Sequence, residues 1–146
     1  MAFLELWRAH PGNNGSARGW HPEVPGEEGR GVDAAMALSQ ALGQVKLLPQ
    51  LLADARPTAA GVASLLDRAG VKDFGPRQVV TARNVSAFLQ AVFGQTGVIF
   101  AAGGGDHIDV WNGYRSASLG LAQWTGRVDG TASLGGTNEI WFWPLA

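Results

Sequence analysis

The sequence of 146 residues contains no cysteine. This absence excludes disulfide bonds, thiolate metal sites and a cysteine nucleophile from the chain. An excess of charge of one sign is also missing, because eleven basic residues face twelve acidic ones and give a net charge of -1. The basic residues are scattered along the chain, so no electrostatic footprint marks a surface for nucleic acid or anionic membranes. We expect neither partner.

Long hydrophobic runs are missing as well, since no segment approaches the roughly 20 apolar residues of a membrane span. Residues 1–7 lack the basic region and apolar stretch of a secretory signal peptide. We therefore predict no membrane insertion, and export, if it occurs, without a cleaved signal peptide. Apolar residues are nevertheless plentiful at 46%, against 16% charged. This composition and length predict one globular domain over residues 1–146.

Turn and capping residues divide the first two thirds of the chain into a loop and several helices. Prolines and glycines in residues 11–31 predict a long irregular loop. Asp33 is predicted to cap a helix over residues 34–42, with Gly43 as its end. Two further helices are each expected to begin after a capping side chain and to end at a glycine: Thr58 to Gly70, and Asn84 to Gly94. This part of the chain is predicted to be mainly helical.

From residue 96 onward, short runs of β-branched and aromatic residues are separated by glycines. Such runs predict neighbouring antiparallel strands: 97–102, 107–111, 121–128 and 139–143. Helices followed by a series of strands are typical of the α+β class. We therefore predict N-terminal helices packed on a C-terminal antiparallel β-sheet.

The run from His107 to Gly113 is the most informative segment, because His107 is the only one of three histidines in a strongly patterned stretch. Side chains alternate along a strand, so His107 and Asp109 share one face and Ile108 and Val110 the other. We expect the apolar pair to face the core, which leaves the imidazole on a face that can host a site. A strand histidine facing a helix N-terminus is the arrangement of cysteine amidases, in which a third polar group orients the ring.

Other interpretations of these residues remain open. His107 can be a structural histidine bonded to a loop, and Asp109 a solvated carboxylate at a strand edge. Glycines 103–105 predict a hairpin turn rather than a phosphate-binding loop, because no Lys-Ser/Thr pair follows them. His10 and His21 lie in irregular N-terminal sequence and no His-Glu-x-x-His pattern occurs, so we expect no metal site and no cofactor.

Several stretches, in order along the chain, carry a resemblance to a known family: residues 3–7 (FLELW), 34–42 (AAMALSQAL), 88–89 (FL) before 97–100 (GVIF), 107–113 (HIDVWNG) and 140–143 (IWFW). The sequence resembles the type VI secretion amidase effectors of the fourth family, which are papain-like peptidoglycan amidases of the NlpC/P60 group. The most specific match is His107-Ile-Asp-Val-Trp-Asn-Gly, close to the family's Gly-His-Ile-Asp-Leu-Trp-(Asp/Asn)-Gly.

The resemblance implies a catalytic role for two positions. The family's helix reads Cys-Ala-x-x-x-Ser-x-Ala-Leu, so Ala34 occupies the position of the nucleophile, and His107 matches the general base. The implied reaction is hydrolysis of the amide between D-glutamate and meso-diaminopimelate in peptidoglycan stem peptides. With alanine at 34 the chain is predicted to be inactive. An introduced substitution and a natural one both agree with the sequence.

The third catalytic position departs from the family pattern. The family carries an acidic residue about ten positions after its histidine, whereas residues 110–127 contain no Asp or Glu. Ser118 lies near that position and carries no charge. Asp109 is the candidate to orient the imidazole instead, although it is an awkward partner for His107 two residues away on the same strand. Asn112 is a weaker candidate.

The resemblance also implies partners and a place of action. Stem peptides of peptidoglycan are the implied substrate, and a cognate immunity protein and a secretion apparatus are the implied protein partners. A contact-dependent system would deliver the protein, without a signal peptide, into the periplasm of rival bacteria. The alternative is an inactive pseudoenzyme that binds cell-wall peptides or a protein partner. A third hypothesis is an unrelated α+β binding domain whose motif match is accidental.

Overall fold

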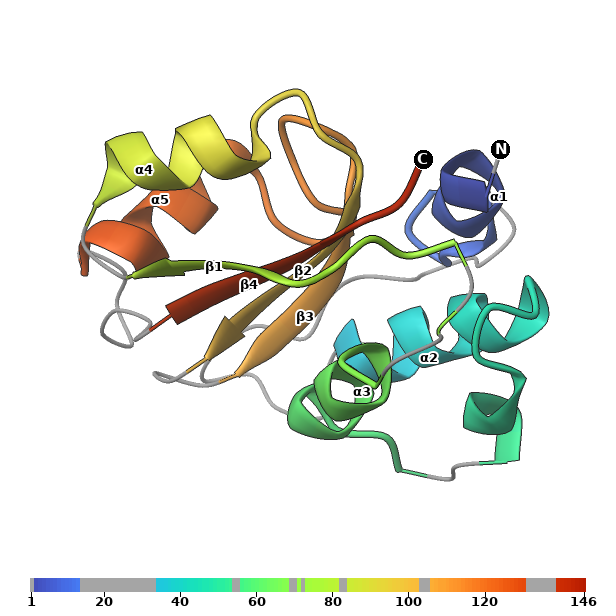
Figure 1. Ribbon diagram of the computed structural model, residues 1–146. Coiled ribbons are helices and arrows are strands. Elements are labelled where there is room, and N and C mark those ends of the chain that lie inside the picture. The colour runs from blue at the N-terminus through green and yellow to red at the C-terminus, as the bar shows by residue number, and fades with distance from the viewer. Residues whose placement is uncertain are drawn as a thin grey trace.

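A computed structural model of the chain describes residues 2–13, 34–53, 56–68, 71, 73–81, 84–102, 106–130 and 139–146. Within these residues lie five α-helices, a short 3-10 helix and a four-stranded antiparallel sheet, which confirms the predicted α+β class (Figure 1). The elements in chain order are α1 (Ala2–Ala9), α2 (Ala34–Gln44), η1 (Pro49–Ala53), α3 (Ala59–Leu66), β1 (Gln78–Thr81), α4 (Val85–Val92), β2 (Gly97–Ala102), β3 (His107–Trp111), α5 (Leu121–Asp129) and β4 (Glu139–Pro144). None of the helices in this part of the chain has the length and apolar character needed to cross a membrane.

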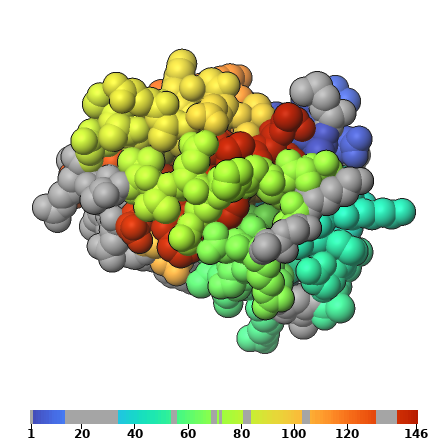
Figure 2. All heavy atoms as spheres, in the orientation of Figure 1, coloured from blue at the N-terminus to red at the C-terminus, as the bar shows by residue number. Residues whose placement is uncertain are grey.

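The sheet has the strand order β1-β4-β2-β3, so β2 is a central strand and β3 lies at one edge. In the register of these strands Val98 of β2 pairs with Val110 of β3 on one side and with Trp143 of β4 on the other. The space-filling view shows β1 crossing the molecule in green, with red atoms of β4 visible beside it (Figure 2). The strand that carries His107 is therefore at the edge of the sheet opposite to β1.

Helices cover both faces of the sheet. On one face α1, α2 and α3 contribute side chains such as Leu6, Leu38 and Val62 to a core that includes Val98 and Ile108. On the other face α4 and α5 cover a second core (Figure 1). The sheet is thus the middle layer of three, and burial of its two faces explains why β2 is a nearly continuous apolar run.

Strand β3 confirms the predicted alternation and adds one difference. Ile108 and Val110 are buried in the core formed with α2, as expected. The opposite face was expected to be open for a site, but Asp109 and Trp111 on that side are also fully buried. The rings of Trp111 and Trp124 are perpendicular, with their centroids 6.2 Å apart. Only the first residue of the strand, His107, keeps a partly exposed side chain.

The predicted strand over residues 121–128 is wrong, because this segment forms helix α5. Its buried residues, Trp124 and Val128, are four positions apart and so lie on one helical face. The Gln123 side chain accepts a hydrogen bond from the Gly120 N–H at 2.8 Å at the start of the helix. Gly130 ends it with a left-handed φ of 84°. The segment forms a helix despite its strand-like composition, because its buried residues have helical spacing and both of its ends are stabilised.

The predicted helix starts at Thr58 and Asn84 are confirmed, since each side chain accepts a hydrogen bond from the backbone N–H three residues on. Helix α2 extends to Gln44 rather than ending at Gly43. The missing side chain of Gly43 makes room for Leu52. Strand β1 was not predicted. Asp33, Gly70, the predicted hairpin turn at 103–105 and most of the predicted loop, residues 14–31, lie outside the described residues.

Gly97 of β2 has no room for a side chain. A Cβ at this position would overlap the backbone carbonyl oxygen of Trp143 and lie 2.9 Å from the Phe142 ring. Gly97→Ala is therefore expected to lower the free energy of unfolding by about 3 kcal/mol. Chemical denaturation measures the loss, and Gly120→Ala is the control, because a Cβ there would meet only the Gln123 side chain at 3.7 Å. Equal stability of the two variants would contradict this account.

Candidate functional site

His107 is the first residue of β3, and its side chain is 13% exposed. Its ring meets the indole of Trp124 nearly edge-on, with centroids 5.5 Å apart and an interplanar angle of 63°. That indole is itself held, because its Nε1–H donates to the Ser116 hydroxyl at 2.9 Å. Helix α5 therefore supplies a rigid wall for the imidazole, and one part of the ring remains accessible to solvent.

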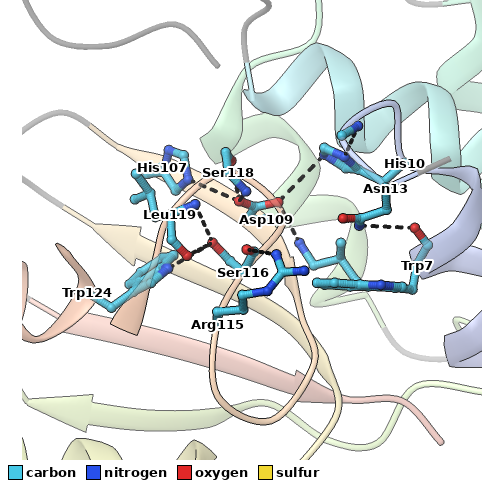
Figure 3. A network of polar contacts seen from close by, with 12 residues as sticks. Trp7, His10, Asn13, His107, Asp109, Arg115, Ser116, Ser118, Leu119 and Trp124 are labelled. Atoms are coloured by element: carbon cyan, nitrogen blue, oxygen red, sulfur yellow. Dashed lines mark hydrogen bonds and ion pairs between the residues drawn. The ribbon is translucent and has the colours of Figure 1, made fainter. Parts of the chain in front are cut away.

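Asp109 lies beside His107, with 3.5 Å between its Oδ2 and Nε2 of the imidazole (Figure 3). The carboxylate is fully buried. The Ser118 N–H donates to the same Oδ2 at 2.9 Å, and the Ser118 hydroxyl donates to it too. Side chains two apart on a strand share a face, which lets the long histidine side chain lean along the strand to its neighbour. The structure thus brings together the two residues considered an awkward pair.

The chain after β3 folds back and places Ser118 against Asp109. The Ala117 N–H donates to the Val110 carbonyl at 3.1 Å, and Trp111 forms an isolated bridge with Ser116. Ser118 lies near the position where the family that the sequence resembles has its acid. Here Ser118 instead donates two hydrogen bonds to the Asp109 carboxylate. In this arrangement the negative charge beside the imidazole comes from Asp109.

Asn112 serves the turn that follows β3. Its side-chain oxygen accepts hydrogen bonds from the backbone N–H groups of Tyr114 and Arg115, at 3.2 and 3.1 Å. An asparagine that bonds to the backbone two and three residues later is typical of a turn. The geometry gives this residue a structural task rather than a place beside the imidazole.

His10 belongs to the same cluster, and sequence reasoning missed it. Its side chain is fully buried, its Nδ1 accepts the Gly12 N–H at 3.1 Å, and its Nε2 lies 3.6 Å from Asp109 Oδ1. Figure 3 shows His10 and His107 on opposite sides of the carboxylate. The residue directly follows α1, in sequence that was interpreted as irregular. No local pattern connects position 10 with position 109, so only the tertiary structure reveals the contact.

Ala34 is the first residue of α2 and is partly exposed, while its neighbour Ala35 is buried in the core. Helix α2 packs against β3, the strand that carries His107. The start of a helix has a partial positive charge and directs backbone N–H groups outward along its axis. A side chain at this position would experience an environment that stabilises a negative charge.

Burial and hydrogen bonding have opposite effects on the charge of Asp109. Burial alone would raise the pKa of the Asp109 carboxyl, but the hydrogen bond and charge of His107, the charge of His10 and the Ser118 hydroxyl together hold it below its ordinary value. For His10, burial dominates and lowers the pKa of the imidazole, against the attraction of Asp109 and with the repulsion of His107. The site therefore favours an ionised Asp109, while burial works against a proton on His10.

The lowered pKa of His10 predicts a loss of stability in mild acid. Below about pH 6.5 the unfolded chain binds a proton at this histidine more readily than the folded protein does, so stability is full above that pH and falls as the pH drops below it. His10→Gln removes this titration, and the loss of unfolding free energy between about pH 7.5 and 5.5 is expected to be smaller than in the parent. Urea denaturation at both pH values measures it. Equal losses in both proteins would contradict the assignment.

The described residues hold no group of three or more His, Asp or Glu side chains arranged for a metal ion. In the cluster around Asp109 both carboxylate oxygens already accept backbone N–H groups, from Val110 and Ser118. The arrangement suits an oriented imidazole that moves protons. Neither a family model nor a curated protein matches the sequence, so the assignment of a function to this site depends on its geometry and on the resemblance of its motifs.

Proposed function

We propose that this domain is a peptidoglycan amidase of the papain-like NlpC/P60 type in which Ala34 occupies the position of the cysteine nucleophile. The observation that supports this proposal most directly is the contact of His107 with the buried Asp109. Its Nε2 lies 3.5 Å from a buried carboxylate, which leaves Nδ1 as the nitrogen that can accept a proton from a nucleophile. An imidazole oriented by a buried acid on one nitrogen is the arrangement required of a general base.

The elements around His107 support the same type of site. Helix α2 begins at the nucleophile position and packs against the strand that carries the histidine. A helix N-terminus lowers the pKa of a thiol placed there, and its N–H groups can hold an oxyanion. The coarse architecture, helices packed on an antiparallel sheet, agrees with the NlpC/P60 fold.

With cysteine at position 34 the reaction would proceed in two steps. The thiolate attacks the carbonyl carbon of the D-glutamate side of the amide, while His107 holds the thiol proton and then gives it to the departing nitrogen of meso-diaminopimelate. Water, deprotonated by His107, next attacks the thioester and releases the D-glutamate carboxyl group and the free thiol. Alanine has no lone pair for the first step, so the present chain would bind the stem peptide without cleaving it.

The biological setting is proposed from the resemblance alone. A protein of this kind would be delivered into the periplasm of rival bacteria by an interbacterial secretion system. An immunity protein would then protect the producing cell, most simply by covering the partly exposed ring of His107.

Restoring the nucleophile tests the proposed function. Ala34→Cys is incubated with purified muropeptides that contain meso-diaminopimelate, and the products are identified by mass spectrometry. We expect cleavage of the D-glutamate–diaminopimelate bond by Ala34→Cys and none by the parent. Gln40→Cys is the matched control, since it places an exposed thiol on the same helix away from its start.

Two outcomes would overturn the proposal. A folded Ala34→Cys variant that leaves the muropeptides intact contradicts the amidase. If that inactive variant and the parent both bind the stem peptide, the binding pseudoenzyme replaces it. Cleavage by Gln40→Cys at a similar rate would show that the reaction does not depend on the site at the start of α2.

A further inference from the structure

We propose that His10 is a positioning residue of this site, which holds one oxygen of Asp109 so that the other oxygen stays directed at His107. The inference rests on the proposed function as far as catalysis is concerned. It makes helix α1 and the turn after it a part of the site, although they lie far from β3 in the sequence.

The hydrogen bond of the His10 ring decides which of its nitrogens carries the proton. Because Nδ1 accepts the Gly12 N–H at 3.1 Å, the proton of the neutral imidazole is on Nε2. Nε2 lies 3.6 Å from Asp109 Oδ1, and the whole side chain is buried. Nδ1 therefore has a hydrogen-bond partner, whereas the contact of Nε2 with the carboxylate is electrostatic and longer than a hydrogen bond.

The two carboxylate oxygens of Asp109 have different partners. Oδ1 receives the Val110 N–H at 2.9 Å and faces His10, whereas Oδ2 receives both donors of Ser118 and faces His107. The terminal torsion of an aspartate is broad, so contacts on both oxygens are needed to fix its plane. Without His10, Oδ1 would keep only the N–H of the adjacent residue, and the carboxylate could turn away from His107.

Helix α1 and the turn after it hold His10 in place. Helix α1 is fixed to the end of the chain, since the Phe3 N–H donates to the Ala146 carbonyl at 3.1 Å and Leu6 is fully buried. The Asn13 side chain donates to the Trp7 carbonyl at 3.1 Å and closes the turn that contains His10 (Figure 3). A packed helix and a closed turn thus carry the imidazole to a defined place.

Two substitutions separate the contact with Asp109 from the contact with Gly12. In His10→Asn the side-chain oxygen can still accept the Gly12 N–H, but the donor no longer reaches Asp109. In His10→Gln the longer amide can place an N–H donor where Nε2 was, while the acceptor for Gly12 is lost. A merely structural role predicts similar damage from both changes, whereas a positioning role predicts damage from His10→Asn and rescue by His10→Gln.

The first measurement needs no catalysis and uses the chain with alanine at 34. The ¹⁵N shifts of the His107 ring report which nitrogen carries the proton in the neutral form. We expect the proton on Nε2, facing Asp109, in the parent and in His10→Gln. In His10→Asn we expect the population with the proton on Nδ1 to rise several-fold.

The second measurement uses Ala34→Cys and the same muropeptides. Adding His10→Asn is expected to lower kcat about 10- to 100-fold with KM within about twofold, while adding His10→Gln changes kcat by less than about threefold. Equal effects of the two substitutions on kcat and on the ¹⁵N shifts, or no effect of either, would overturn the positioning role. If Ala34→Cys itself does not cleave, the proposed function fails, and the ¹⁵N shifts alone still decide whether His10 positions Asp109.

Discussion

Asp109→Asn is expected to lower the free energy of unfolding by about 3–5 kcal/mol, the usual cost of removing one partner from a buried charged network. Both oxygens of the native carboxylate accept N–H donors, from Val110 on one side and Ser118 on the other. An asparagine has one oxygen and one NH2 group, so whichever way it turns, its NH2 faces donors. One side of the buried cluster then loses its acceptor.

Urea denaturation of the parent and of Asp109→Asn measures this loss near neutral pH. Asp106→Asn is the matched control, because Asp106 is exposed and lies just before the same strand. The control is expected to stay within about 1 kcal/mol of the parent. If Asp109→Asn were as stable as the control, the carboxylate would not be the buried acceptor at the centre of the cluster.

The largest functional effect is expected from His107→Gln in the Ala34→Cys background. General acid–base catalysis by a positioned histidine contributes about 10²–10⁴ in rate, and in the proposed reaction the same imidazole also activates the nucleophile. We therefore expect kcat to fall by about 10³ or more. KM is expected to change little, because the residue acts on the reacting proton rather than on the bound peptide.

Steady-state rates with muropeptides measure the fall in kcat. His10→Gln in the same background is the matched control, since it makes the same chemical change on the other side of Asp109 and is expected to keep most of the activity. If His107→Gln retained the rate of Ala34→Cys, His107 would not be the general base.

Local signals in the sequence predicted much of the fold. Thr58 and Asn84 begin helices because their side chains satisfy backbone N–H groups three residues on, which requires no distant contact. The alternation over residues 107–111 predicted correctly that Ile108 and Val110 face the core. Helix α5 was missed because its β-like composition conceals the four-residue spacing of Trp124 and Val128.

The site was harder to predict because its contacts come from distant parts of the chain. His10 reaches Asp109 only because α1 packs beside the C-terminal residues, and no periodicity in the sequence reports that packing. Ser118 could be noticed for its place after the histidine, but its role as a donor depends on the fold of the turn after β3. Local patterns thus predicted the strand that carries His107, and tertiary contacts supplied its surroundings.

The proposed function requires that position 34 and His107 are two halves of one site. The most direct test is the pH dependence of alkylation of Ala34→Cys by iodoacetamide, with and without His107→Gln. We expect the thiol of Ala34→Cys to react with a midpoint well below the ordinary cysteine pKa of about 8.5, and His107→Gln to move the midpoint back toward that value. A midpoint near 8.5 that does not respond to His107→Gln would contradict the claim.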